Sequence, residues 1–370
     1  MIQKRISVYI RAADRPSSYY RILQYINRIQ PSNISINIAE SRFVYNLKQK
    51  VNNKIIKALI FSLIYIFIAI KTTISILKDL LIFRPKIIII SREMFPRYVP
   101  IFSYIFMKKI LVNRTVIWDF DDNILESREI SKKEWMLLGV NSNIIVVTHK
   151  DLKNFLNVSA RNKVVMLPTT DCAMMDHDIK ILNNKRLETY KNQIILIWVG
   201  TSVNLKYVES IIHIINQAAK TITKEYKKKV LLKIVCDKPL LANLEFLTID
   251  NIKWTRQRAV MEMELSHIGI MPLENNKFTI GKGAFKLIQY ESAGMPVLGS
   301  NVGFNSAAVD HGVNGFLIHN SQEWIKYLIN LSIDQRKWAE MSAASRRKWE
   351  SEFNCRKNLA WWRDIITDLN

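Results

Sequence analysis

Short apolar runs alternate with segments of helical periodicity along the whole chain. In the first half, runs of β-branched residues predict buried strands, and the stretches between them carry apolar residues at helical spacing. Such alternation is typical of a parallel sheet covered by helices on both faces. The strands expected here are residues 7–10, 33–38, 86–90, 115–120, 143–148 and 163–167, and the helices are 19–30, 43–82 and 95–111.

The second half repeats this plan after a polar, charged stretch that predicts a domain boundary. We expect an α/β chain with two doubly wound domains, in which ligands bind beyond the carboxyl ends of the strands. The expected organisation is a first domain at 1–170, a linker at 171–192, a second domain at 193–345 and a final helix at 346–370. The strands expected in the second domain are 193–199, 230–235, 252–254, 268–271, 297–299 and 315–318, with helices at 205–220 and 282–294 and a helical tail from 334.

The segment 282–297 has the most informative chemistry of the chain. It predicts a helix entered through glycines, and at helical spacing Lys282, Lys286 and Gln289 share one face, with Tyr290 beside them. Two ammonium groups near a helix N-terminus favour an anion. The pattern therefore predicts a cradle for a diphosphate, with an amide one turn further on for a sugar hydroxyl. The alternative is an amphipathic surface helix with two solvated lysines.

The charge balance of the 370-residue chain suggests an anionic partner. Lys and Arg number 54 against 32 Asp and Glu, which makes the formal net charge +22. A membrane surface, a nucleotide or a nucleic acid would suit this excess, although a Lys- and Asn-rich composition from codon bias would explain it equally. Because no nucleic-acid-binding motif accompanies the scattered lysines, a nucleic-acid-binding protein is the weaker alternative to an enzyme. A non-catalytic scaffold on a membrane is a third class.

The cysteines and the N-terminus suggest the compartment. Cys172, Cys236 and Cys355 are odd in number and far apart, without a C-x-x-C pair. We therefore expect neither a disulfide nor a zinc site, which fits a reducing cytosol. No apolar stretch typical of a signal peptide follows the N-terminus.

Residues 58–70 are apolar all round, broken only by Ser62. A bilayer span needs about 20 residues, so this run is too short to cross one. Two interpretations stay open. The segment is a buried helix of the α/β domain, or it lies in a membrane interface with flanking lysines at anionic headgroups. The flanking lysines are Lys54, Lys57, Lys71 and Lys78.

A series of short motifs in the second half resembles a known family. In their order and spacing they are similar to the nucleotide-sugar-binding domain of a GT-B-fold glycosyltransferase of family 4 type, over residues 194–352. The motifs are residues 198–201, 269–273, 281–286, 289–297, 302–305 and 312–317, with looser matches at 16–21, 119–122 and 167–168.

The resemblance implies two Rossmann-like domains facing a central cleft, and a final helix that packs back onto the first domain. Similar motifs occur in a bacterial branch that builds cell-surface polysaccharide. The resemblance to the family implies a retaining enzyme that needs no metal and no cofactor. The enzyme would move a sugar from a nucleotide-diphosphate donor to a surface-polysaccharide or lipid-linked glycan acceptor. Its expected place is the cytoplasm, at the inner face of the bacterial membrane, with peripheral contact to anionic lipid and no nucleic acid.

On this resemblance, Lys282 and Lys286 neutralise the leaving diphosphate, where fixed cations stabilise developing charge. Gln289 stands where many members carry a Glu that binds the ribose, so the charge-assisted bond of a carboxylate is missing. The other expected donor-binding residues are Gly200 and Thr201 at a strand end, Gly303, and Glu274.

The acidic cluster at the end of strand 115–120 has three interpretations. It is a D-x-D metal motif, it orients an acceptor hydroxyl, or it forms caps and salt bridges at a strand end. We consider the metal motif the least favoured, because the lysines already supply positive charge. The cluster contributes Asp119 and Asp121 as candidate catalytic residues, and His149, after a later strand, is a third. The candidates for binding the acceptor are Asp122, Arg92, Ser17, Ser18 and Arg21.

Overall fold

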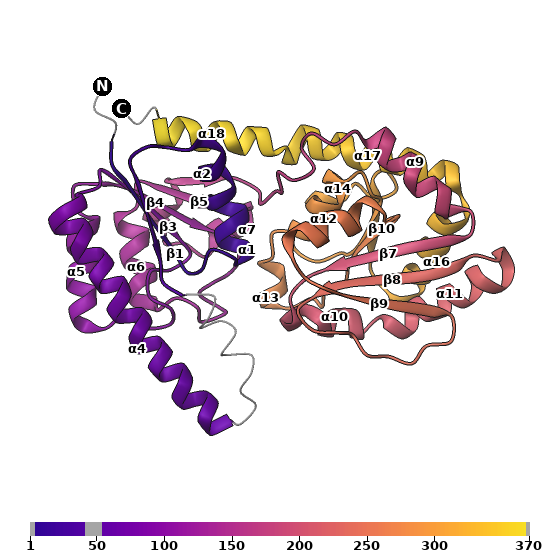
Figure 1. Cartoon of the computed structure of the whole chain (residues 1–370), viewed down its shortest axis with the longest axis horizontal. Coiled ribbons are helices and arrows are strands. Elements are labelled where there is room, and N and C mark those ends of the chain that lie inside the picture. The colour runs from indigo at the N-terminus through magenta and orange to yellow at the C-terminus, as the bar shows by residue number, and fades with distance from the viewer. Residues whose placement is uncertain (1–3, 41–53, 368–370) are drawn as a thin grey trace. The chain divides into compact units, whose positions relative to one another are not determined.

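The computed structural model describes residues 4–40 and 54–367 and divides the chain into two compact units (Figure 1). Unit 1 comprises Met1–Thr169 and Lys357–Asn370, and unit 2 comprises Thr170–Arg356. The last helix, α18 (Cys355–Thr367), therefore begins in unit 2 and continues in unit 1.

Unit 1 is built on a parallel sheet of six strands in the order β2-β1-β3-β4-β5-β6. From β1 the chain adds β2 on one side and then β3 to β6 on the other, which makes the sheet doubly wound. Every residue of β1 and of β3 is buried, because helices cover both faces of the sheet. The strands are β1 (Ile6–Ile10), β2 (Ile34–Ile38), β3 (Ile87–Ser91), β4 (Thr115–Phe120), β5 (Ile144–Val147) and β6 (Val164–Met166).

The helices of unit 1 differ from the prediction in two places. The helix expected at 95–111 begins only at Ile101, with Pro100 as its N-cap, since the residue before a proline is disfavoured in helical conformation. Of the helix expected at 43–82, residues 43–53 lie outside the described part of the chain. The helices are α1 (Pro16–Ser18), η1 (Tyr19–Leu23), α2 (Gln24–Ile29), α4 (Lys54–Lys78), η2 (Asp79–Phe83), α5 (Ile101–Leu111), α6 (Lys132–Asn141), α7 (Lys150–Asn154) and α8 (Val158–Arg161).

Unit 2 contains a second parallel six-stranded sheet, in the order β12-β11-β10-β7-β8-β9. The two sheets confirm the predicted α/β class with two doubly wound domains. One strand was placed too late in the sequence, because β9 has alternating exposure at the sheet edge in place of a continuous apolar run. The strands are β7 (Gln193–Val199), β8 (Lys229–Cys236), β9 (Leu247–Lys253), β10 (Ile268–Met271), β11 (Val297–Ser300) and β12 (Gly315–Ile318).

The segment 171–192 is more than a linker. It contains helix α9, which belongs to unit 2 and buries Arg186 completely. The guanidinium of Arg186 donates to the carbonyls of Met263 at 2.9 Å and of Glu264 at 3.1 Å. The helices of unit 2 are α9 (Ile179–Tyr190), η3 (Ser202–Asn204), α10 (Leu205–Glu209), α11 (Ile212–Tyr226), α12 (Arg256–Glu264), α13 (Lys277–Ile280), α14 (Phe285–Ser292), α15 (Asn305–Ala308), α16 (Ser321–Ile333), α17 (Gln335–Lys348) and η4 (Trp349–Phe353).

Residues in the segment 346–358 make polar contacts within each of the two units. Arg346 donates to the carbonyl of Met174 at 2.9 Å, and Lys348 pairs with Asp310 at 2.9 Å. Both basic side chains are almost fully buried. Within unit 1, Asn358 of α18 donates to the carbonyl of Pro168 at 2.8 Å.

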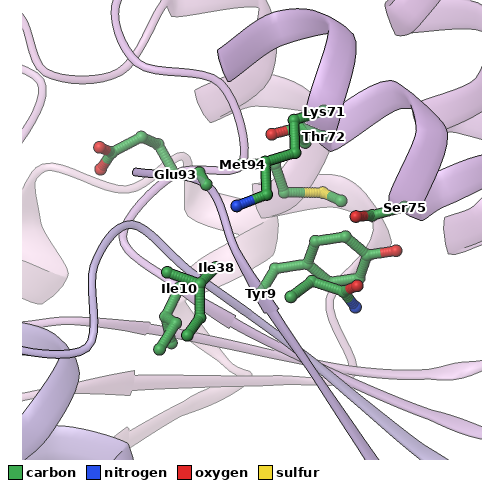
Figure 2. Close-up of a pocket in the computed structure, with 10 residues that line it drawn as sticks. Tyr9, Ile10, Ile38, Lys71, Thr72, Ser75, Glu93 and Met94 are labelled. Carbon is green, nitrogen blue, oxygen red and sulfur yellow. The ribbon is translucent and has the colours of Figure 1, made fainter. Parts of the chain in front are cut away.

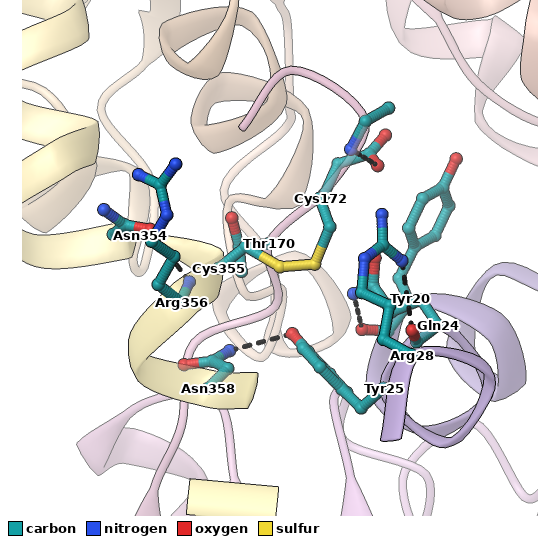
Figure 3. Close-up of a disulfide and its surroundings, with 12 residues drawn as sticks. Tyr20, Gln24, Tyr25, Arg28, Thr170, Cys172, Asn354, Cys355, Arg356 and Asn358 are labelled. Atoms are coloured by element: carbon teal, nitrogen blue, oxygen red, sulfur yellow. Dashed lines mark hydrogen bonds between the residues drawn. A yellow bond between two sulfur atoms is a disulfide. The ribbon is translucent and has the colours of Figure 1, made fainter. Parts of the chain in front are cut away.

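A disulfide joins Cys172 to Cys355, which are 183 residues apart in sequence (Figure 3). The prediction that no disulfide forms is therefore wrong. Spacing along the chain did not reveal the pair, because the return of the chain to the start of unit 2 brings the two Cα atoms within 5.3 Å. Cys236 is a buried free thiol.

We expect protein that is denatured without reductant to titrate one thiol per chain, that of Cys236. After reduction all 3 cysteines should react. Thiol titration and peptide mapping of unreduced protein measure this. In the matched control Cys236→Ser the unreduced signal should vanish, whereas three thiols before reduction would contradict the disulfide.

Candidate functional site

Lys286 lies beside the carboxyl end of β7. It occupies the first turn of α14, and its ammonium lies 5.7 Å from the ring centroid of Trp198. A Cβ placed on Gly200 would lie 3.0 Å from Cε of Lys286 and 2.5 Å from the Trp198 ring. Only glycine therefore fits at position 200, where the end of the Lys286 side chain lies over the half-buried backbone at a strand end.

Lys282 is not part of the helix that contains Lys286. It lies in the loop between α13 and α14, where its N–H donates to the carbonyl of Thr279 at 3.1 Å. Its ammonium lies 4.5 Å from the ring centroid of Phe278. The prediction of one helical face for the two lysines is wrong in this respect, because Ala284 adopts a left-handed conformation and α14 starts after it.

Gln289 and Tyr290 are both buried in unit 2. Gln289 donates from Nε2 to a carboxylate oxygen of Asp171 at 2.8 Å. The hydroxyl of Tyr290 accepts the N–H of Val199 at 2.9 Å, which ties the end of β7 to α14. Sequence reasoning missed Asp171, and its place directly after the predicted boundary was the available signal.

The other expected donor residues have ordinary structural roles or face solvent. Gly303 has a φ of +54°, and a Cβ there would lie 2.5 Å from the carbonyl oxygen of Ile280, so glycine is required by packing. Thr201 is exposed and accepts a hydrogen bond from Asn204 at 3.2 Å. Glu274 is also exposed.

In unit 1, Asp119 and Arg21 form a buried ion pair. Nη2 of Arg21 lies 2.5 Å from Oδ1 of Asp119, and the side chains are 2% and 1% exposed. Arg21 also donates to the carbonyl of Leu167 and to Thr169. Burial raises the pKa of Asp119, and Arg21 opposes that rise. The pair joins β4 to η1, and neither side chain faces solvent as an acceptor-binding group would.

Arg92 gathers three carboxylates beyond the ends of β3 and β4. It contacts Asp121 at 2.7 Å, Glu129 at 2.9 Å and Asp122 at 3.5 Å. Burial raises the pKa of Asp121 to about 6, although Arg92 opposes the rise and Asp122 adds to it. Burial alone would lower the pKa of Arg92, but the surrounding carboxylates outweigh this effect, and the pKa is raised above its usual value. This cluster keeps Asp121 and Asp122 partly exposed.

A second arginine extends the cluster to β1 and β2. Arg11 lies 2.9 Å from Glu93, 3.2 Å from Glu40 and 3.7 Å from Glu129. The sequence analysis did not single out Arg11 or Glu40, although each comes directly after a predicted strand or within two residues of it. Figure 2 shows a small pocket beside this cluster, between the ends of β1 and β2 and helix α4. Its lining includes Tyr9, Lys71, Thr72, Ser75 and Glu93.

The remaining acceptor and acid–base candidates lie nearby but are largely enclosed. His149 is buried as the N-cap of α7, with Nδ1 3.5 Å from a carboxylate oxygen of Asp151. Ser18 is buried and Ser17 is half-buried in the short helix α1. Within residues 4–40 and 54–367, no group of three or more His, Cys, Asp or Glu is placed to hold a metal ion.

The two sets of residues suit different chemistry. In unit 2, the ammonium of Lys286 and the N–H groups that begin α14 together favour a multiply charged anion. In unit 1, partly exposed carboxylates held by arginines can accept hydrogen bonds from hydroxyl groups.

Comparison with known proteins identifies the domain in unit 2. Residues 193–334 match the sequence profile of a family described as Glycosyl transferases group 1. The sequence matches no protein of curated function.

Solved structures similar to this chain cover nearly all of it. HepE from Anabaena, in complex with UDP and glucose, has a TM-score of 0.66 at 11% identity, over 98% of this chain and 99% of that chain. A glycosyltransferase from Rickettsia africae has a TM-score of 0.61 at 15% identity, over 99% and 98%. Sucrose-phosphate synthase from Thermosynechococcus elongatus has a TM-score of 0.60 at 9% identity, over 98% of each chain. The fold is therefore that of the GT-B glycosyltransferases, with two Rossmann-like domains.

We expect Asp119→Asn to lower the free energy of unfolding by about 3–5 kcal/mol, because it leaves the buried Arg21 without its counter-charge. Chemical denaturation measures this. In the control Asp121→Asn the loss should stay below about 1 kcal/mol, since Arg92 keeps two other carboxylates. Unchanged stability in Asp119→Asn would mean that the pair does not support the fold.

Proposed function

We propose that this protein is a glycosyltransferase that moves a sugar from a nucleotide-diphosphate donor to a glycan acceptor. The observation that carries the proposal is the cation of Lys286 beside Gly200, within the domain that matches the glycosyl transferases group 1 profile. A parallel sheet binds its ligands beyond the carboxyl ends of its strands, where this lysine lies. The similar structure of HepE, which holds UDP and glucose, supports a nucleotide-sugar donor.

The proposed mechanism depends on neutralising the leaving diphosphate. Lys286 and the N–H groups at the start of α14 stabilise the negative charge as the sugar–phosphate bond breaks. Lys282 adds a second positive charge from the preceding loop. We assign the enzyme to the retaining, metal-independent class, in which the acceptor hydroxyl attacks from the side of the leaving phosphate. Such a reaction requires positioning and charge stabilisation more than a strong base.

The acceptor side of the proposal depends on unit 1. Asp121 and Asp122 are partly exposed and held by Arg92, so their oxygens can orient a sugar hydroxyl. Because Arg21, Asp119 and Ser18 are buried, we assign them to support of this cluster. We propose a surface-polysaccharide or lipid-linked glycan as the acceptor and the cytoplasmic face of a bacterial membrane as the location. The location rests on the resemblance alone, because the Cys172–Cys355 disulfide removes the support that the cysteines gave to a reducing cytosol.

Helix α4 and its continuation η2 support contact with a membrane. Residues Ala58–Phe83 form a helix long and apolar enough to cross a membrane by length and composition, and 22% of an apolar stretch of 18 residues within it is buried. The expectation that this apolar segment is too short to cross a bilayer is therefore wrong, because the helix continues beyond residues 58–70 to Phe83. Ile64 and Ile68 face the unit, whereas Leu63 and Ile74 are 67% and 59% exposed. A buried core helix does not explain this exposure.

Helix α5 lies against α4, as Figure 1 shows, and its exposed side chains extend the apolar surface. Thr73 and Ser103 join the two helices at 2.8 Å. Ile101 and Phe102 at the start of α5 are 71% and 78% exposed. We name this surface, formed by the exposed faces of α4, η2 and α5, the apolar face.

Charge favours anionic lipid as the occupant of the apolar face. Between residues 41 and 118 the acidic residues are Asp79 and Glu93. Both are buried, Asp79 against the hydroxyls of Ser7 and Tyr9 and Glu93 against Arg11. Exposed cations border the face on both helices, namely Lys78, Lys108 and Lys109. An apolar surface edged by lysines fits the headgroup region of an anionic bilayer.

Lys286→Ala should lower kcat/KM with a nucleotide sugar by about 100-fold or more, as removal of a group that stabilises leaving-group charge does. Steady-state kinetics, after a panel of UDP-, GDP-, CMP- and dTDP-sugars has identified the donor, measure it.

The matched control for this variant is Lys326→Ala. Lys326 is also a helical lysine of unit 2 over an aromatic ring, 5.2 Å from Tyr327. It should keep full activity. Full activity in Lys286→Ala would refute the site, and salt-sensitive binding to arbitrary DNA without nucleotide-sugar binding would favour the nucleic-acid alternative.

Wild-type protein should float with vesicles of phosphatidylcholine and phosphatidylglycerol and bind pure phosphatidylcholine several-fold more weakly. Ile101→Ser with Phe102→Ser should reduce flotation several-fold. Leu241→Ser, at a position 84% exposed elsewhere, should leave it unchanged. A wild type that does not float, or that forms a stable dimer through this face in light scattering, would exclude the lipid.

A further inference from the structure

Gln289 and Asp171 form a buried polar pair in unit 2. Each residue is 2% exposed, and Nε2 of Gln289 lies 2.8 Å from Oδ2 of Asp171. The other oxygen of Asp171 accepts the N–H of Ala173 at 2.9 Å. A hydrogen bond from an amide to a buried carboxylate is stronger than one between neutral groups. The pair therefore determines the conformation of the Gln289 side chain.

The carboxylate of Asp171 also determines that Oε1 of Gln289 is the amide atom that points away from it. If the amide were rotated by half a turn, its Oε1 would meet the Asp171 oxygen without a proton between them. No donor to Oε1 of Gln289 is found within the described part of the chain. Asp171 thus leaves the amide with an oriented acceptor.

This acceptor lies near the anion-binding lysine. Gln289 follows Lys286 by three positions on α14, so the two side chains leave the helix on the same side. In a nucleotide the ribose is joined directly to the diphosphate. A diphosphate held at Lys286 therefore brings a ribose hydroxyl close to the next turn of α14.

The segment that carries Asp171 is anchored on both sides. Before it, Oγ1 of Thr170 accepts the indole N–H of Trp349 at 3.0 Å. After it, Cys172 is joined to Cys355, which Figure 3 shows beside Thr170. The carbonyl of Met174 accepts from Arg346 at 2.9 Å. The carboxylate is thus held in place before any ligand binds, which is the condition for orienting another group.

We propose that Asp171 is a positioning residue that orients the amide of Gln289 to accept a hydrogen bond from a ribose hydroxyl of the donor nucleotide. The inference rests on the proposed function, because it needs a nucleotide diphosphate at Lys286. Position 289 carries an amide in place of a carboxylate. The carboxylate of Asp171 lies next to this amide and affects the ribose only by orienting the amide.

The test compares binding of UDP with binding of 2′-deoxy-UDP and 3′-deoxy-UDP by calorimetry, or of the guanosine set if guanine nucleotides bind better. Wild-type protein should bind the ribonucleotide about tenfold more tightly than at least one of the two analogues, since the missing hydroxyl leaves Oε1 unpaired. Asp171→Ala should reduce this preference to about twofold while the thermal unfolding transition stays cooperative.

A charge-swapped pair separates orientation from folding. Gln289→Glu places two carboxylates together and should abolish the ribose preference. The double variant Asp171→Asn with Gln289→Glu restores an amide–carboxylate bond of opposite polarity, and should recover the preference to within about threefold of wild type. Lys286→Ala should weaken all the nucleotides equally and keep the ratio.

Each outcome separates the two proposals. A wild type that binds no nucleotide contradicts the proposed function. A wild type that binds nucleotides without any ribose preference, or an Asp171→Ala variant that keeps the full preference, overturns the role of Asp171 and leaves the donor site at Lys286 intact. Failure of the double variant to recover the preference also overturns it.

Discussion

The carboxyl ends of parallel strands are the constraint on which both candidate sites depend. All strands of a parallel sheet end at one edge, so residues that follow different strands meet there however far apart they are in sequence. In unit 1 this edge collects Arg11, Arg92 and Asp121, which follow β1, β3 and β4. In unit 2 it brings Gly200 after β7 under Lys286 of α14. The candidate functional residues of this protein are therefore concentrated at the strand ends.

Buried charge is used mainly to position other groups. The pair of Arg21 and Asp119 joins η1 to β4, and Arg346 holds the start of unit 2 by donating to backbone carbonyls. Taking such groups out of water is costly unless every charge is paired, which explains the dense bonding around them. Groups that remain partly exposed, such as Asp122 and Lys286, are the better candidates for contact with substrate.

The apolar face follows a different rule. Most of the core of unit 1 lies between its sheet and helices, yet several large apolar side chains of α4 are exposed, among them Leu63 and Ile74. A soluble protein seldom leaves such a surface without a partner. Because the exposed residues there are mostly apolar, with lysines among them, the face suits the lipid surface proposed above.

The sequence by itself determined the alternation of strands and helices, the two sheets and the choice of Lys286 as a candidate residue. These features follow from local periodicity, from glycines at turns and from short motifs, all of which can be read within a few residues. Only the tertiary structure decided that Lys282 lies outside the helix and that Asp119 forms a buried ion pair with Arg21. It also decided that Gln289 donates a hydrogen bond to Asp171 and that Cys172 forms a disulfide with Cys355. Each of the last three joins residues about a hundred or more positions apart, and no local pattern encodes which distant residue the fold brings next to a buried polar group.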